Sequence, residues 1–433
     1  MPSLMLRIVP SLVALTAAAQ QPLTVQDAIR RAWAGQSGLQ AGEALVERAR
    51  GEAQALRALN LPTLSLGAGL TRTTEPMQVF GMHLDQARIA QSDFMPDRLN
   101  HPAAASGLGA TLTLAQPLYA GGRLDAAARA GAALAGSEAA SQAHRRQQVA
   151  YAVAQAYFGA QVAEQGLRYA EDTLRQATET ERFVTARVDQ GLLLRSEGDR
   201  ARAFRAQSEA GVAEARNRVA SARSGLALLM GADAGGPLAT PVDAPLPAPS
   251  GTPGHRGDLE ALKLQGEAAR QGVAAARGAL KPEVGLSLTA GTARYQVGEG
   301  GNWTTASLGA KWTFSFSDSR RVSAARAQVR AAELGLKWQE QQASREADEA
   351  RRFLDTAQAK IAFAKVALEA SESARAIRTA RHREGLLPLV EVLDAEAGLS
   401  GARTLLLNSE LEWRLGGAQL ALALGQPIEG VTE

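Results

Sequence analysis

The feature that most constrains the fold of this chain is an internal duplication. Residues 185–193 read TARVDQGLL and residues 379–387 read TARHREGLL, an offset of 194, since 385 − 191 is 194. The same offset relates Gly231 to Gly425, each of which follows a Leu- and Ala-rich run. Similarity at a fixed spacing is the signature of repeated structural units, so the two halves are expected to fold alike.

Each copy predicts a long helix, a break at glycine and a second helix. Glycine suits the left-handed position that ends a helix, so Gly191 and Gly385 are expected to form the tips of two helical hairpins. The first helix of each hairpin extends over about sixty residues, or ~90 Å at 1.5 Å per residue. Small residues recur in each at heptad-like spacing, which indicates closely packed helices.

The N-terminus resembles a secretory signal. Arg7 precedes an apolar run at 8–15, and three alanines at 17–19 offer a cleavage site, although a merely apolar tail would also fit. No later stretch approaches the ~18 consecutive apolar residues of a membrane helix, so a membrane-crossing role would need strands. The chain has no cysteine, which excludes disulfides, thiolate metal sites, cysteine nucleophiles and an acylated cysteine anchor.

Composition and motifs argue against several classes of function. The net charge is only +3 and arginine alternates with glutamate, so a nucleic-acid partner is not supported. The five histidines are scattered without metal-ligand spacing, and no metal site is predicted. Phosphate-loop and nucleophile-elbow motifs are missing, so we predict no catalytic residue, no cofactor and no enzyme.

The hydrophobic period changes from helical to alternating in four short segments. A helix is expected over residues 22–60, with Thr24 as its N-cap, and it must end before Pro62. Alternation then predicts strands at 63–71, 107–115, 283–291 and 307–316, each about as long as a tilted membrane strand. Residues 72–106 are expected to form a long loop, with a much shorter, Gly-rich counterpart at about 292–306. Trp312, Phe314 and Phe316 are placed on the lipid-facing surface.

These elements define the domain organisation. We predict a signal peptide at 1–19, a first repeat at 20–231 with its tip near 191, and a second repeat at 258–425 with its tip near 385. A Pro/Gly-rich linker at 232–257 joins the repeats, and a short tail follows at 426–433.

Four strands cannot close a membrane barrel, and open sheet edges are not tolerated in lipid. Because about eight strands is the practical minimum, the chain is expected to oligomerise. A homotrimer with a twelve-stranded barrel is the simplest solution that leaves a lumen. The hairpins would then form a tube on one side of the membrane, which for an exported chain is the periplasmic side.

The chain resembles the TolC-like outer-membrane efflux proteins over essentially its whole mature length. The resemblance depends on the duplicated order of elements, on the segment QPLYAGGR at 116–123, on the two tip sequences and on EVLDA at 391–395. It implies a mainly α fold with a membrane β-barrel: a homotrimeric conduit with a long α-helical barrel and a twelve-stranded barrel in outer-membrane lipid. It also implies a periplasmic adaptor protein and an inner-membrane transporter as partners.

The resemblance assigns roles to residues at both tips. The adaptor-docking positions are Arg187, Gly191, Leu192, Leu193, Arg381, Gly385, Leu386 and Leu387. Glu391 and Asp394, with Glu197 as a weaker candidate, match the acidic ring at the periplasmic entrance. The chain departs from the pattern where a well-known member has a gate-locking arginine and tyrosine, because Leu387 and His382 stand at those places.

Each of these roles has an ordinary structural alternative. Glu391 and Asp394 lie three residues apart, hence on one helical face, and six carboxylates in a trimer would attract cations to a narrow mouth. First-turn acids are also favoured by the helix dipole alone. Arg187 and Arg381 could contact a partner or cap the last carbonyls of a long helix.

We therefore expect the outer-membrane channel of a tripartite efflux pump, a passive gated conduit for small solutes. One alternative is the exit duct of a type I protein secretion system. The other is a periplasmic coiled-coil adaptor or structural protein that never inserts, although such a protein has no reason to carry four lipid-compatible strands.

Overall fold

The computed structural model describes residues 22–233, 236–239, 254–296 and 299–428. The predicted signal peptide, most of the predicted linker and the last five residues lie outside the described residues. The chain divides into two compact units. The hairpin unit comprises residues 1–40, 145–254 and 345–433, and the sheet unit comprises residues 41–144 and 255–344.

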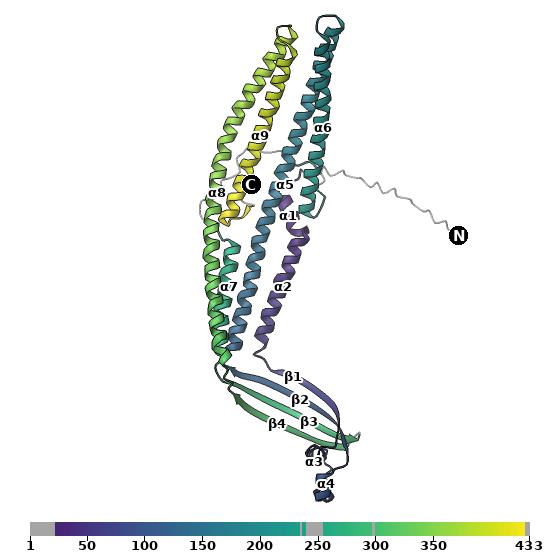
Figure 1. Cartoon of the computed structure of the whole chain (residues 1–433), viewed down its shortest axis with the longest axis vertical. Coiled ribbons are helices and arrows are strands. Elements are labelled where there is room, and N and C mark those ends of the chain that lie inside the picture. The colour runs from purple at the N-terminus through teal and green to yellow at the C-terminus, as the bar shows by residue number, and fades with distance from the viewer. Residues whose placement is uncertain (1–21, 234–235, 240–253, 297–298, 429–433) are drawn as a thin grey trace, which may run out of the picture. The chain divides into compact units, whose positions relative to one another are not determined.

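The predicted fold class is confirmed, since the chain is mainly helical and carries one four-stranded sheet. Its strands are β1 (Thr63–Thr73), β2 (Ala105–Ala120), β3 (Glu283–Gln296) and β4 (Glu299–Lys311). They lie side by side in the order β1-β2-β3-β4, and every pair is antiparallel (Figure 1). Strands from both repeats therefore share one sheet, in which β2 of the first repeat pairs with β3 of the second.

The register gives this sheet two chemically different faces. One row across all four strands is Ser65, Thr113, Thr289 and Thr305. The adjacent row is Leu64, Leu114, Leu288 and Ala306, which points to the opposite side because strand side chains alternate. We call these sides the hydroxyl face and the leucine face. The leucine face is solvent-exposed in this chain, and Leu66 and Leu70 are each 79% exposed.

Four strand boundaries predicted from alternation are wrong by five residues or more, since the second strand continues to Ala120 instead of 115 and the third to Gln296 instead of 291. The fourth strand begins at Glu299 instead of 307 and ends at Lys311, and residues predicted as a Gly-rich loop at 292–306 belong mostly to β3 and β4. The Ser315 hydroxyl accepts a hydrogen bond from the backbone N–H of Ser317, so helix α8 starts at Phe316.

Trp312, Phe314 and Phe316 therefore do not lie on the fourth strand, although all three side chains are exposed, as their predicted place on a lipid-facing surface requires. All three follow the end of β4, and the Trp312 indole donates to the carbonyl of Leu280 at 3.1 Å. Phe314 and Phe316 stack edge to face at 5.7 Å. Their alternation with Thr313 and Ser315 imitates a strand, but the local hydrogen bonds of serine select the start of a helix.

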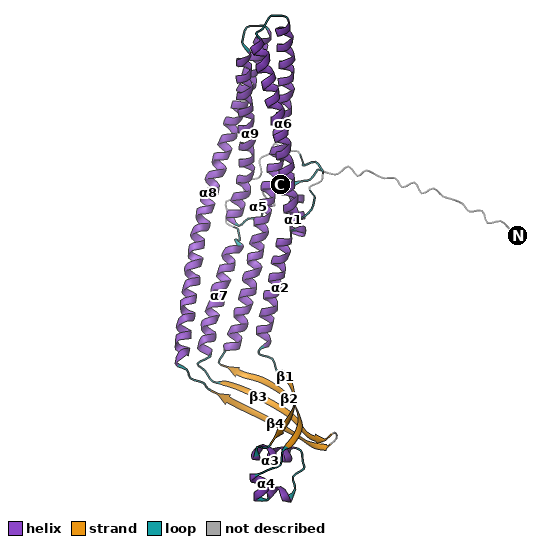
Figure 2. Cartoon of the chain, turned by 45° about the vertical axis from the view of Figure 1, so that its right-hand side comes forward, coloured by secondary structure: helices purple, strands orange, loops and turns teal. Residues whose placement is uncertain are grey.

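The long predicted loop at 72–106 is also more ordered than expected. It contains α3 (Pro76–Asp85), the 3₁₀ turn η1 (Gln91–Phe94) and α4 (Pro96–Asn100). Proline begins both α-helices, because its fixed φ and missing N–H suit the first helical turn. These helices lie at one end of the strands (Figure 2).

The helix expected at 22–60 is divided in two. Thr24 caps α1 (Val25–Gly35) as predicted, since its hydroxyl accepts from the N–H of Asp27 at 3.1 Å. Gln36 has an extended ψ of 116°, and α2 (Ser37–Ala58) follows. In the sheet unit, α7 (Gly257–Gly278) holds the position in the second repeat that α2 holds in the first.

Two long hairpins account for most of the remaining chain. The first is α5 (Arg123–Asp189) with α6 (Arg195–Met230), and the second is α8 (Phe316–Arg383) with α9 (Leu389–Leu424). The long helices have 67 and 68 residues, close to the length expected. No helix in the described part of the chain combines the length and hydropathy that a membrane-spanning helix needs.

The core of the hairpin unit lies where α1 packs against α5, α6 and α9. It contains Ala28, Ile29, Val153, Tyr157 and Leu226, all nearly or fully buried. The Tyr157 hydroxyl donates to the carbonyl of Leu23 at 2.7 Å. Burial raises the pKa of Tyr157 to about 12, so this hydroxyl keeps its proton and remains a donor.

The contact between Gly35 and Gly231 tests this packing. Gly231 has a φ of +65°, and a Cβ there would lie 2.6 Å from the carbonyl oxygen of Gly35. Gly231→Ala is therefore expected to destabilise the hairpin unit by about 2–4 kcal/mol, because backbone strain and overlap add. Gly225→Ala, on the same helix with open space around its Cβ, is expected to be neutral or stabilising by up to about 1 kcal/mol. Thermal unfolding followed by circular dichroism measures both, and equal melting temperatures would contradict the close contact.

Candidate functional site at the hairpin tips

Both tips close by the same backbone device. Gly191 and Gly385 have φ values of +74° and +81°, a region that side-chain-bearing residues rarely adopt. The N–H of Leu192 bonds the carbonyl of Arg187 at 2.8 Å, and the N–H of Leu386 bonds that of Arg381 at 2.9 Å. These bonds satisfy the last carbonyls of α5 and α8, as in a Schellman motif. The repeated sequence thus produces a repeated turn.

A small apolar core holds the two tips together. Val184 of α5, Ala201 of α6, and Leu389 and Val392 of α9 are all nearly or fully buried in one cluster. Phe183 packs against it. Because α5 and α6 belong to the first hairpin and α9 to the second, burial of these side chains stabilises the pairing of the hairpins, at about 25 cal/mol per Å² of apolar surface.

Arg187 joins the two tips through polar contacts. Its Nη2 donates to the carbonyl of Arg383, the last residue of α8, at 3.0 Å. Its guanidinium also lies 4.8 Å from the centre of the Phe183 ring. The side chain caps a long helix, as the structural alternative proposed, but the helix is that of the other hairpin. Arg381, its counterpart in the repeat, is exposed.

The acids of the second tip share one arginine that sequence reasoning missed. Arg378 Nη1 lies 3.3 Å from a carboxylate oxygen of Glu391 and 3.1 Å from one of Asp394. The structure therefore brings Glu391 and Asp394 together on one face of α9. Arg378 lies seven residues before Gly385 and Asp394 nine after it, so antiparallel pairing about the tip could have identified the contact.

The first tip lacks this arrangement. The 194-residue offset equates Glu197 with Glu391, but it equates Val184 with Arg378 and Arg200 with Asp394. Glu197 is therefore not part of an acidic pair. Its Oε2 is buried without a hydrogen-bond partner among the described residues.

A second ion pair occurs at both tips with its charges exchanged. In the second hairpin Arg375 of α8 bonds Glu396 of α9 at 2.7 Å, and Glu396 is only 7% exposed. The equivalent positions in the first hairpin are Glu181 and Arg202, whose side chains approach to 4.0 Å. The repeats thus keep these two positions near each other and exchange their charges, but in the first hairpin the nearer partner of Glu181 is Arg205, at 2.5 Å.

His382 is the residue that the resemblance aligns with a gate-locking tyrosine. It is 5% exposed, and its Nδ1 lies 2.8 Å from the carbonyl oxygen of Leu387. That carbonyl can only accept, so Nδ1 carries the proton. The ring meets Phe183 edge to face at 5.9 Å, while Nε2 is buried without a partner. His382 thus fixes the second turn.

The tips enclose a cavity of about 450 Å³. Its lining is polar and apolar in nearly equal parts, and two of the lining residues, Glu197 and His382, have a buried side-chain atom (Oε2 and Nε2) without a hydrogen-bond partner among the described residues. Of the positions expected from the resemblance to dock an adaptor, those that line the cavity are Arg187, Gly191, Leu192, Leu193, Gly385, Leu386 and Leu387. Among the described residues, no group of His, Asp or Glu side chains is arranged to hold a metal ion.

Comparison with solved structures identifies the fold. The chain is similar to the outer membrane channel CmeC of Campylobacter jejuni, with a TM-score of 0.82 and 16% identity over 93% of this chain and 85% of that one. It is also similar to the outer membrane protein VceC of Vibrio cholerae, with a TM-score of 0.78 and 22% identity over 93% of this chain and 96% of that one. For the open state of the MtrE outer membrane channel of Neisseria gonorrhoeae, the TM-score is 0.77 and the identity 20%, over 94% of this chain and 90% of that one. Comparison with curated protein sequences gives no match.

Comparison with protein families identifies the relationship. Residues 28–232 and 252–426 match the family described as outer membrane efflux protein, which covers both repeats and well over half of the chain. Members of this family are channels and catalyse no reaction. The chain therefore belongs to the outer membrane efflux protein family and is an outer-membrane efflux channel.

Proposed function

We propose that three copies of this chain form the channel of a tripartite efflux pump, with their sheets joined in a twelve-stranded barrel. The observation that supports this most directly is the exposed leucine face. It extends over all four strands, with its leucines 41–79% exposed: Leu64, Leu66, Leu70, Leu108, Leu112, Leu114, Leu286, Leu288 and Leu308. A surface this apolar is expected in water only where a partner or a membrane covers it.

The sheet edges favour further copies as part of that cover. β1 pairs only with β2 and β4 only with β3, so each outer strand has an unpaired edge. Unpaired backbone groups cost several kcal/mol each in hydrocarbon. Pairing β4 of one copy with β1 of the next satisfies both edges, and three copies give a barrel with room for a lumen. The hydroxyl face then lines that lumen.

The hairpins supply the periplasmic part of the proposed conduit. Export directed by a signal peptide at 1–19 would leave the helices on the periplasmic side of the outer membrane. The tips would meet a periplasmic adaptor protein through the Gly-Leu-Leu segments of both repeats, and the adaptor would connect them to an inner-membrane transporter. Solutes would pass without chemical change, and movement of the hairpins would gate the entrance.

Glu391 and Asp394 would form the entrance ring, in which Arg378 offsets part of their negative charge. Three copies bring six carboxylates from Glu391 and Asp394, but also three guanidinium groups within 3.3 Å of them. Each copy thus contributes one net negative charge, not two. Such a ring still raises the local concentration of cations, although less than an unpaired one would.

Single-channel conductance in planar bilayers tests the channel and its ring together. We expect Glu391→Gln/Asp394→Asn to reduce the cation-to-anion permeability ratio about twofold, and Arg378→Gln to increase it by a similar factor. Opposite shifts are expected because the first change removes negative charge and the second removes its compensation.

The matched control is Glu43→Gln/Glu47→Gln, which removes the same charge from the exposed surface of α2. If the protein conducts but no variant changes the cation-to-anion permeability ratio, the channel proposal stands and the acidic ring is rejected. A folded trimer that does not conduct in lipid would reject the membrane channel itself.

A further inference from the structure

The connection between β1 and β2 does not extend freely beyond the sheet. We call residues 74–104 the exit segment; it contains α3, η1 and α4. Figures 1 and 2 place α3 and α4 beside the same end of the four strands. Within the sheet unit, α3 contacts β2, β3 and β4. The question is which face of the sheet this helix occupies.

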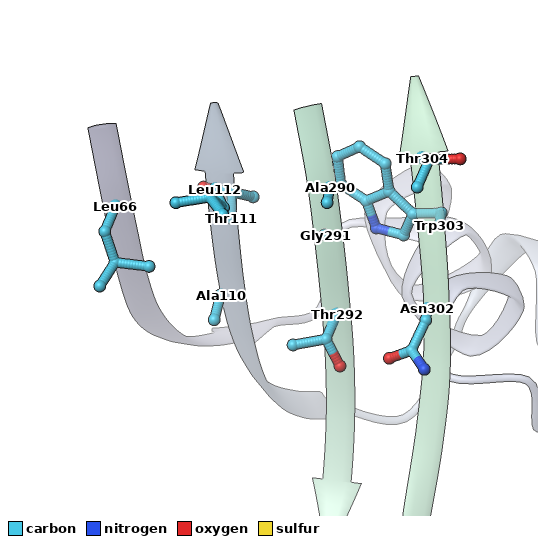
Figure 3. Close-up of a pocket in the computed structure, with 10 residues that line it drawn as sticks. All are labelled: Leu66, Ala110, Thr111, Leu112, Ala290, Gly291, Thr292, Asn302, Trp303 and Thr304. Carbon is cyan, nitrogen blue, oxygen red and sulfur yellow. The ribbon is translucent and has the colours of Figure 1, made fainter. Parts of the chain in front are cut away.

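A row of residues without large side chains crosses the sheet at this end. Gly69, Gly109, Ala293 and Gly301 pair across the four strands, four positions along each strand from the Ser65–Thr305 row. Since side chains alternate, an even separation puts this row on the hydroxyl face. In the row that lies between these two rows, the Trp303 indole lies against Gly291 (Figure 3). A Cβ atom on Gly291 would overlap the indole ring. This end of the hydroxyl face is therefore flat enough for backbone to approach closely.

The exit segment approaches the sheet at Gly301 of this row and at Gly107, whereas no described atom of the segment lies within 4 Å of the Cβ positions of Gly69 and Gly109. A Cβ on Gly301 would overlap the carbonyl oxygen of Asp85, at the end of α3. A Cβ on Gly107, which also lies on the hydroxyl face, would overlap the side-chain amide of Gln86. Both glycines point toward the same part of the segment, so α3 ends against the hydroxyl face.

Polar contacts hold the segment in this position. Gln86 is 1% exposed, and its Nε2 donates to the carbonyl of Ser106 in β2 at 3.2 Å. The Arg88 guanidinium lies 5.0 Å from the centre of the Tyr295 ring in β3. The amide nitrogen of Gln86 thus has a partner on the sheet, and leaving this buried donor unpaired would cost about 1–3 kcal/mol. The amide oxygen, Oε1, is buried without a hydrogen-bond partner among the described residues.

The segment also has a small core of its own. Val79 is 4% exposed, and the rings of Phe80 and Phe94 meet edge to face at 5.7 Å. The Asp93 carboxylate accepts from the N–H of Ala90 at 2.8 Å and lies 3.8 Å from His83 Nδ1. The segment is therefore expected to move as one folded piece, if it moves at all.

We propose that the exit segment is an inward-folded constriction of the channel exit, a proposal that rests on the trimeric barrel proposed above. If the leucine face meets lipid, the hydroxyl face lines the lumen, and a helix seated on it lies inside the barrel. Three copies then narrow the lumen at this end of the barrel. Large solutes pass only when the contacts of Gln86 and Arg88 release.

Thiol labelling from outside intact cells tests the proposal independently of the periplasmic entrance. The chain has no cysteine, so Thr305→Cys gives a single thiol on the exposed hydroxyl face of β4. We expect a bulky polyethylene-glycol maleimide to label it slowly. Labelling should become about tenfold faster when residues 74–104 are replaced by a Gly-Asn-Gly-Gly turn, as expected for removal of a lid.

A point substitution gives the same test without a deletion. Gly301→Val, combined with Thr305→Cys, should unseat α3 and accelerate labelling, because its side chain overlaps Asp85. Gly309→Val is the matched control on the same strand and the same face, since nothing lies within 4 Å of its Cβ position. It should leave the labelling rate unchanged.

Two control cysteines separate this proposal from the one on which it rests. Asp97→Cys, exposed on the exit segment itself, should label rapidly in every background. Leu66→Cys on the leucine face should not label in the membrane. Equal labelling of Thr305→Cys with and without the exit segment would overturn the constriction alone. Labelling of Leu66→Cys but not of Thr305→Cys would reverse the faces and overturn both proposals.

Discussion

Leu66→Arg is expected to prevent the protein from reaching its membrane-inserted, assembled form, whereas Ser65→Arg next to it is expected to be tolerated. Leu66 lies on the leucine face and is 79% exposed. An arginine that faces lipid near the centre of a membrane strand costs about 2–4 kcal/mol, and a trimer contains three of them. That total is comparable with the whole stability of many domains. Ser65 lies on the hydroxyl face, where water would solvate the new charge.

The measurement is the amount of heat-resistant oligomer in purified outer membranes, with total protein in the cell as the reference. We expect the Leu66→Arg oligomer to be lost and the Ser65→Arg oligomer to remain near the wild-type amount. Leu112→Arg on β2, in the same row as Leu66, should repeat the first result. Equal yields for the two neighbours at positions 65 and 66 would show that neither face meets lipid, and the barrel would have to be abandoned.

The sequence predicts the parts of this fold that depend on short-range periodicity. The duplication locates both tips, because a glycine in the same nine-residue pattern must make the same turn. Alternation locates the four strands, since the leucine and hydroxyl faces require period two. These signals are strong because a shift of one residue would exchange the two faces.

The errors occur where a local hydrogen bond competes with the pattern. Alternation continues through Phe314 and Phe316, but the hydroxyl of Ser315 binds the backbone two residues on and starts α8. Residues 292–306 are rich in glycine, which predicted a loop, yet Gly301 is a strand position where the end of a helix approaches. Glycine marks close approach as often as it marks a turn, and sequence alone does not distinguish these uses.

The candidate site was predicted in outline but not in its charges. Glu391 and Asp394 were identified from the family resemblance of residues 391–395, and their spacing placed them on one helical face, whereas the Arg378 that joins them lies across the hairpin turn. The exchanged pairs Arg375–Glu396 and Glu181–Arg202 were missed for the same reason. Such contacts depend on the register of two helices, which a pattern within one helix does not contain.

The second large effect is expected from Gly385→Val, which should abolish efflux without preventing assembly in the membrane. Gly385 has a φ of +81°, which valine adopts only at a cost of about 1–3 kcal/mol. The nearest atom to its Cβ position, Arg187 Nη1, lies at 3.8 Å, so the effect comes from the backbone and not from overlap. A relaxed turn would displace Leu386 and Leu387, two of the proposed docking residues.

If docking of the adaptor requires the original turn, the backbone strain that valine introduces at position 385 lowers the affinity for the adaptor roughly ten- to hundredfold. Drug tolerance of cells that depend on this channel measures the loss, and binding of the purified adaptor gives its size. Gly385→Asn should retain much of the function, because asparagine tolerates the left-handed region. Gly398→Val, in an open position within α9, controls for added bulk. Wild-type tolerance in Gly385→Val cells would show that the tip conformation is not what the partner recognises, whereas loss in both valine variants would indicate general damage to the hairpin.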